Sequence, residues 1–359
     1  ASLERPGSLP DGVLDAINAS TGWLHTGDPA LLLHTDKLFA SLREKMAGGW
    51  FDELLRQLFA PAPVQVVQVP TLPQKDEAGE PIRTDGKLVL EHPLTAADLG
   101  DGAKTAAGAR ELLAGAQLLH HPSAGSLYLN FYYDLGHVKP EDMQYLDLLT
   151  DVLDELDSSA HTAQQLNTLR STWLGDSRVQ LDIWTGRQEG APCHAKLSLC
   201  LSLLERSLEK AVELGGEWLY DTRLTGPAAE AAFARVLSQQ KLNMEQQFIQ
   251  QGNAYAATRA SAHYSVDGAV SERCSGVSYY KFLCDLLAKA DWAALGAKLD
   301  ALRTEVLQNA QLTVSLYGSE DALAKLRSLL PGSRFAAEGR REAVPYTEPL
   351  TPPVNEAFI

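Results

Sequence analysis

The segment Ser126–Asp134, with the sequence SLYLNFYYD, restricts the fold of this chain more than any other part. Apolar and polar side chains alternate along it and aromatic residues are frequent, which is typical of a β-strand with two unlike faces. We expect one face to carry Leu127, Leu129, Phe131 and Tyr133, and the other to carry Tyr128, Asn130 and Tyr132. Such a strand requires a sheet whose apolar face is covered by other elements.

A helix is expected soon after this strand. Pro140 stands at its first position, and Glu141 and Asp142 follow in the first turn, where acids complement the helix dipole. Further strands are predicted at Arg178–Thr185, His194–Leu201 and Leu312–Leu316, and further helices at Thr162–Leu174, Leu203–Leu214, Pro227–Gln251, Tyr279–Leu287, Trp292–Leu307 and Glu320–Leu330. This order predicts an α+β fold in which helices pack on one face of a largely antiparallel sheet.

The parts of the chain before and after this pattern differ from it. Residues 1–70 form a mainly helical segment, with a helix at Phe51–Phe59 and a short strand at Val64–Val69 near its end. Residues 71–105 are a polar linker, and Ala106–Leu119 is expected to form a helix followed by a strand. We place the α+β domain at residues 106–335 and a Pro-rich linker at 336–359.

Composition excludes several classes of function. The 359 residues carry a net charge of −15, and the isoelectric point is near 5.0, which argues against nucleic acid as a partner. No apolar run is long enough to cross a membrane. The four cysteines show no closely spaced pair, so reduced thiols are expected. The N-terminus does not resemble a signal peptide, and the chain is expected to begin in mid-protein or after processing.

No motif for a metal or a nucleophile is evident in the sequence. His-x-x-Glu-His, Glu-x-x-His and Gly-x-Ser-x-Gly do not occur. His120 and His121 are adjacent, so on a strand they point to opposite faces, and we interpret both as surface residues. Cys193, His194 and Cys200 are separated in the same way and are not expected to bind a metal.

Four segments together are similar to the presequence-protease subfamily of pitrilysin/insulinase-type zinc peptidases. They are His121–Leu156, Leu219–Leu237, Gly252–Leu287 (GNAYAATRASAHYSVDGAVSERCSGVSYYKFLCDLL) and Leu312–Gly318. The resemblance implies four homologous α+β domains in two halves that close around an unfolded peptide, with zinc in the first domain. Residues 1–70 then resemble the end of the second domain, residues 106–335 the third, non-catalytic domain, and residues 336–359 a linker toward a missing fourth domain.

The resemblance also implies where the zinc motif of the first domain has its counterpart. That motif lies on the helix after the first strand, and here this helix begins at Pro140. Its three metal and base positions fall on Leu146, Leu149 and Thr150, a degenerate set in which leucine can neither bind zinc nor carry a proton. Tyr255 ends a Gly-x-Ala-Tyr segment, Gly252–Tyr255, that resembles a substrate-binding segment of the fourth domain. Ile249 stands where that segment has arginine, so Tyr255 and Arg259 are interpreted as packing and a local ion pair.

The sequence thus predicts a non-catalytic portion of a zinc metalloendopeptidase, with no catalytic residue and no metal or other cofactor in this chain and with zinc in the parent peptidase. Tyr128, Asn130 and Tyr132 either contact peptide in the chamber or form a solvated sheet face. Expected partners are unfolded peptides, the catalytic N-terminal half and the fourth domain. The alternative is a free-standing peptide-binding or scaffold protein, which a start and a stop codon at these chain ends would favour. Alanine-rich composition favours a bacterial cytoplasm.

Overall fold

The computed structural model describes residues 11–28, 35–60, 109–123, 125–186, 191–350 and 352. The chain divides into two units, one at Glu4–Thr105 and one at Ala106–Ile359, which also takes in Ala1–Leu3. The expected strand Val64–Val69 and the linker at residues 71–105 lie outside the described residues.

The first unit is helical in its described part. It contains α1 (Asp11–Thr26), α2 (Thr35–Ala47) and α3 (Trp50–Phe59). The helix expected at Phe51–Phe59 is therefore confirmed as α3. Apolar side chains recur along α3 at helical spacing, and four of them are exposed: Trp50, Phe51, Leu55 and Phe59.

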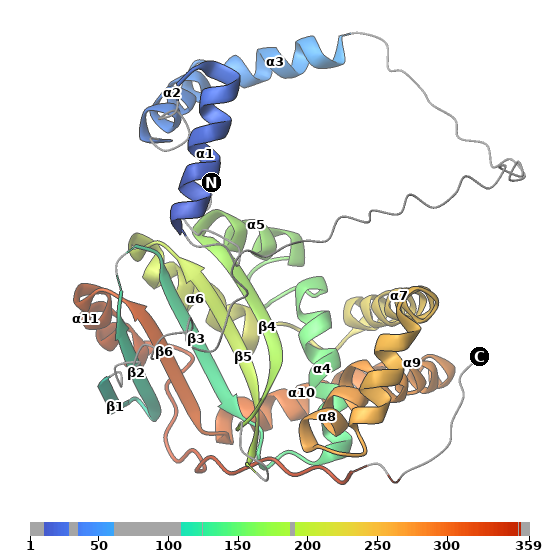
Figure 1. Cartoon of the computed structure of the whole chain (residues 1–359). Helices are drawn as coiled ribbons and strands as arrows, with labels where there is room; N and C mark the ends of the chain where they lie inside the picture. The colour runs from blue at the N-terminus through green and yellow to red at the C-terminus, as the bar shows by residue number, and fades with distance from the viewer. Residues whose placement is uncertain are drawn as a thin grey trace, which may run out of the picture. The chain divides into compact units, whose positions relative to one another are not determined.

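The second unit is built on a six-stranded sheet in the order β1-β2-β6-β3-β5-β4 (Figure 1). The strands are β1 (Ala109–Leu113), β2 (Ala116–Pro122), β3 (Leu127–Asp134), β4 (Leu174–Thr185), β5 (Cys193–Leu203) and β6 (Leu312–Gly318). β2 and β6 pair in parallel, and the other neighbours pair antiparallel. The predicted α+β class with a largely antiparallel sheet is confirmed.

Eight α-helices accompany this sheet in the described part of the unit. They are α4 (Pro140–Val152), α5 (Ala163–Trp173), α6 (Leu208–Tyr220), α7 (Pro227–Ser261), α8 (Val266–Ser275), α9 (Val277–Lys289), α10 (Trp292–Asn309) and α11 (Glu320–Leu329). In Figure 1, α6, α10 and α11 lie behind the strands, on one face of the sheet. α6 contacts β5, α10 contacts β3, α11 contacts β6 and α4 contacts β4.

The alternation of β3 decides which face the helices cover. Leu127, Leu129, Phe131 and Tyr133 are all at most 1% exposed and belong to the core. Their register partners on β5 and β6 are leucine and valine residues that are also buried. The predicted division of this strand into two faces is confirmed, and among the described helices of this unit those that contact β3 lie on its apolar face.

Residues 109–122 differ from the sequence expectation. A helix followed by a strand was predicted, and the structure has a hairpin of β1 and β2. The turn uses Ala114 and Gly115, both with positive φ, a backbone region that glycine adopts readily. A Cβ at Gly115 would lie 1.6 Å from the carbonyl oxygen of Ala337. The pairing of β2 with β6 overrides the helix propensity of the Leu- and Ala-rich sequence.

Two other segments contain more ordered structure than the sequence predicted. α7 reaches Ser261, and Gln251, where its end was predicted, is the non-helical kink inside it (φ −134°). In the segment predicted as a Pro-rich linker, residues 336–350 and 352 are described, and Tyr346 forms a β-bridge with Cys193. Tyr346 is 2% exposed, and its hydroxyl donates to Glu348, which forms an ion pair with Arg273.

Phe335 connects this C-terminal segment to the core. Its ring stacks on Phe131 with centroids 3.8 Å apart, and both side chains are fully buried. We expect Phe335→Ala to lower the free energy of unfolding by about 3–5 kcal/mol, as for other buried phenylalanines. Urea unfolding followed by circular dichroism measures it. Arg341→Ala, which removes an exposed ion pair with Glu305, is the control and should change stability by less than about 1 kcal/mol. Equal effects of the two changes would contradict this packing.

Candidate functional site

The face of the sheet opposite the helices is the first candidate site, and we call it the open sheet face. It carries Tyr128, Asn130 and Tyr132 of β3 together with their register neighbours. One transverse row is formed by Asp176, Ser202, Tyr128, Tyr317 and His121. The next two rows are Arg178, Cys200, Asn130, Ser315 and Leu119, and then Gln180, Ser198, Tyr132, Thr313 and Gln117.

Aromatic rings gather at two places on the open sheet face. At one, Tyr128 and Tyr317 are directly opposite each other, and His121 stacks on Tyr317 with centroids 4.5 Å apart. At the other, Tyr132 meets Trp184 edge-on at 5.5 Å. Tyr128, Tyr317 and Trp184 are 40%, 42% and 46% exposed. These rings offer large, rigid contact areas of the kind that bind peptide side chains.

Charged groups surround the second of these places. Asp182 accepts a hydrogen bond from Gln180 at 2.7 Å. Lys196, which stands opposite Asp182 on β5, forms an ion pair with the buried Asp134 of β3. Burial, helped by Cys200 and Asp182, raises the pKa of Tyr132 to about 12. The Tyr132 hydroxyl is therefore a neutral donor at physiological pH and not a base.

Two hydroxyl groups on this face have no hydrogen-bond partner among the described residues. The Oγ atoms of Ser198 and Ser202 are buried and unpaired there. Both residues are on β5, beside Tyr132 and Tyr128 in the register. A buried hydroxyl without a partner is unfavourable by about 1–3 kcal/mol.

Helix α4 carries the positions that the family resemblance assigns to a degenerate zinc motif. Leu146 and Leu149 are fully buried in the core. The hydroxyl of Thr150 donates to the carbonyl oxygen of Asp147 at 2.8 Å. These side chains offer no ligand set that fits zinc. In the described parts of the chain, no group of three or more His, Cys, Asp or Glu residues is arranged to hold a metal ion.

Two carboxyl groups lie on α4 beside these positions, one turn apart. Burial raises the pKa of Asp147 well above its ordinary value, and the nearby charge of Asp151 adds to the effect. Burial also raises the pKa of Asp151, against hydrogen bonds from Gln240 and Tyr279 that lower it. Gln240 donates at 2.5 Å, and the Tyr279 hydroxyl lies at 3.5 Å. Asp151 therefore links α4 to α7 and α9.

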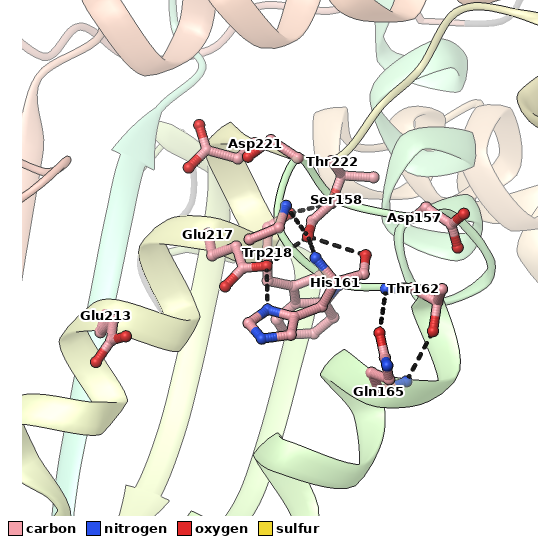
Figure 2. A network of polar contacts seen from close by, with 12 residues as sticks. Asp157, Ser158, His161, Thr162, Gln165, Glu213, Glu217, Trp218, Asp221 and Thr222 are labelled. Atoms are coloured by element: carbon pink, nitrogen blue, oxygen red, sulfur yellow. Dashed lines mark hydrogen bonds and ion pairs between the residues drawn. The ribbon is translucent and has the colours of Figure 1, made fainter.

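Ser158, His161 and Glu217 form a polar network that no sequence motif indicated (Figure 2). The Ser158 hydroxyl donates to the Glu217 carboxylate and accepts from the backbone N–H of His161 at 2.8 Å. The His161 Nδ1 atom contacts the same carboxylate at 2.8 Å. No imidazole nitrogen reaches the hydroxyl in these contacts, so the arrangement does not activate a nucleophile. It attaches the turn before α5 to α6.

The remaining polar candidates have structural roles. His120 was interpreted as a surface residue, which is wrong: it is 3% exposed, and its Nε2 contacts the carbonyl oxygen of Gly318 at 3.0 Å. As expected, Arg259 forms an ion pair with Glu272, at 3.3 Å, and the ring of Tyr255 packs against Phe248.

Two further expectations concern the cysteines and membrane spans. All four cysteines are free thiols, as predicted. No helix in the described ranges has the length and apolar character that a membrane crossing requires.

Comparison with known proteins gives one family match. The peptidase-associated family of the M16 peptidases, subfamily C, matches residues 95–286, more than half of the chain. The chain is 27% identical over 214 residues to presequence protease 1, chloroplastic/mitochondrial, of Arabidopsis thaliana. This alignment covers 57% of this chain and 19% of that protein. It is 18% identical over 352 residues to protein HypA of Clostridium perfringens, covering 88% of this chain and 36% of that protein.

Among solved structures, the first half of the periplasmic protease PqqL from Escherichia coli matches with a TM-score of 0.47 and 14% identity. The match covers 68% of this chain and 49% of that one. With 19% and 36% of their lengths matched, the chain spans well under two thirds of the two curated relatives named above.

The carboxyl pair on α4 makes stability depend on pH. Because the pKa of Asp147 is raised in the folded state, that state binds more protons than the unfolded state above the ordinary pKa of 3.8. Stability is then greatest below that value and falls as pH rises toward the folded pKa. We expect Asp147→Asn to raise the free energy of unfolding at pH 8 and to leave it nearly unchanged at pH 3.5.

Urea unfolding at both pH values measures this effect. Asp285→Asn, which removes the same charge from an exposed position of α9, is the matched control and should show no such difference between the two pH values. A loss of stability at pH 8 in the Asp147 variant would contradict the assignment.

Proposed function

This chain belongs to the family of regions associated with M16 peptidases of subfamily C, and from that membership we propose that it is a non-catalytic portion of a zinc metalloendopeptidase. Its role is to complete the chamber in which unfolded peptides are bound and degraded. In this proposal the chain binds peptide and positions it, and another part of the same protein supplies the zinc and the activated water.

The open sheet face is the observation that carries the proposal. Its exposed aromatic rings stand on a sheet whose opposite face packs against α6, α10 and α11. An extended peptide points alternate side chains to one side, so rings spaced along one face of a strand can contact alternate side chains of the peptide. Tyr128, Asn130 and Tyr132, at the centre of this face, are the proposed peptide-contacting residues.

The composition of α4 supports the same division of roles. Leu146 and Leu149 are core residues, and Thr150 bonds to its own helix, so this helix packs against the sheet and has no side chain for metal chemistry at those positions. A helix that no longer needs ligands can bury leucine there, which stabilises the domain by about 1.5–3 kcal/mol per side chain.

The proposed partners are the remaining parts of the parent protein. The chain matches only 19% and 36% of the length of its two curated relatives, so a catalytic N-terminal half and a fourth domain are proposed as its neighbours. A bacterial cytoplasmic location is part of the proposal and rests on composition alone.

Peptide binding by the 359-residue chain tests the proposed function. We expect a fluorescein-labelled unfolded peptide of mixed composition to bind, and Tyr128→Ala to weaken binding about 5- to 30-fold, the usual effect of losing an exposed aromatic anchor. Fluorescence anisotropy measures both affinities. Tyr264→Ala removes a tyrosine that is 82% exposed and lies outside the sheet, and it should leave affinity unchanged. Equal loss in both variants, or no binding by the unmodified chain, would refute the proposal.

A further inference from the structure

We infer that the open sheet face selects extended peptides that carry a basic side chain four residues from an aromatic or large apolar one. The inference rests on the proposed function and names the class of substrate for that site. It depends on two subsites. The cation subsite consists of Tyr132, Trp184 and Asp182, and the aromatic subsite consists of Tyr128, Tyr317 and His121.

The cation subsite combines two ring faces with a carboxylate. The rings of Tyr132 and Trp184 meet at 70° with centroids 5.5 Å apart, and Asp182 precedes Trp184 by two positions on the same face of β4. Aromatic faces attract Lys and Arg side chains, and a neighbouring carboxylate adds to the attraction. The subsite therefore favours a cation over a neutral or acidic side chain.

The charges near Asp182 are consistent with this selectivity. Lys196, its opposite neighbour on β5, is engaged by Asp134, so the transverse row of Asp182, Lys196 and Asp134 holds one more negative than positive charge. The donor to Asp182 is Gln180, which is neutral. The next cation along β4, Arg178, stands one row further along the sheet, opposite Cys200 of β5. A basic side chain of a peptide would provide the missing positive charge.

The aromatic subsite is a contiguous apolar surface across three strands. Tyr128 on β3 is the register partner of Tyr317 on β6, which in turn pairs with His121 on β2. The His121 and Tyr317 rings are nearly parallel, at 13°, and the Tyr317 side chain is 42% exposed. Stacked and exposed rings of this kind favour an aromatic or large apolar side chain.

The spacing follows from the geometry of β3. Tyr128 and Tyr132 are four residues apart on one strand, which separates them by about 13 Å at a rise near 3.3 Å per residue. A peptide that lies extended along β3 has the same rise, and its residues i, i+2 and i+4 point to one side. Positions i and i+4 therefore reach the two subsites, and positions three apart do not point to the same side.

Between the subsites lies a group that can bind the peptide backbone. Asn130 is the middle residue on this face of β3, two positions from Tyr128 and two from Tyr132. Its side-chain amide can form hydrogen bonds that do not depend on the peptide's sequence.

Four labelled peptides test the inference with the 359-residue chain. The reference contains Lys and Phe four residues apart in an otherwise neutral, unfolded sequence, and a second peptide reverses their order. A third replaces Lys by Glu, and a fourth places Lys and Phe three residues apart. We expect one of the first two to bind most tightly, and the Glu and spacing changes each to weaken binding about tenfold. Fluorescence anisotropy gives the affinities.

Three protein variants show whether a preference for Lys comes from the cation subsite or from the general attraction of cations to a chain of net charge −15. Asp182→Asn should reduce the preference for Lys over Glu about fivefold. Glu213→Gln, which removes one exposed charge from α6, should leave that preference unchanged. Trp184→Ala should weaken the Lys peptide and leave the Glu peptide unaffected.

The outcomes distinguish this inference from the proposed function. If peptides bind and depend on Tyr128, but the Lys preference is absent or is lost equally in the Asp182 and Glu213 variants, the inference is wrong and the proposed function stands. If the spacing of three binds as well as four, the two-subsite geometry is wrong. If no peptide binds, both are wrong.

Discussion

The unequal covering of the two faces of the sheet is the constraint on which the rest of this structure depends. β3 is central in the sheet and pairs with β5 and β6. Four of its side chains belong to the hydrophobic core: Leu127, Leu129, Phe131 and Tyr133. α10 contacts β3, and α6 and α11 contact its neighbours β5 and β6 on the same face, so Tyr128, Asn130 and Tyr132 face the other way. Phe131 and Phe335 stack within that core, which also holds the C-terminal segment against the sheet. One strand thus fixes the packing of the helices and presents the candidate site.

The packing of helices against the sheet also explains why α4 has leucine at Leu146 and Leu149. A helix that packs against a sheet must bury an apolar stripe, and here Leu146 and Leu149 belong to that stripe. Side chains at these positions point into the core, where a ligand set for zinc has no place. α4 also carries two partly buried carboxyl groups, Asp147 and Asp151, and burial raises the pKa of both. Asp151 bonds to Gln240 of α7 and Tyr279 of α9. Packing therefore dominates the composition of this helix.

Sequence patterns predicted much of the fold because they report local periodicity. The alternation of residues 127–133 and the proline and acids that begin α4 each depend on neighbouring residues, and both predictions are confirmed. The hairpin at Ala109–Pro122 was missed because its strands depend on pairing with β6, nearly two hundred residues later. The network of Ser158, His161 and Glu217 was missed for the same reason, since the residues are brought together only by the docking of α6. His120 was placed on the surface because a strand pattern does not reveal which ends of a sheet are covered.

If the proposed function is right, peptide lies on the open sheet face and not on the helical side. Site-specific photocrosslinking distinguishes the two, with a benzophenone-bearing phenylalanine in place of Tyr128 on the open sheet face or of Leu242, which is 52% exposed on α7. Irradiation of the 359-residue chain with an unfolded labelled peptide should transfer the label from the Tyr128 position and not from the Leu242 position. Transfer of label at Leu242 with none at Tyr128 would contradict the account.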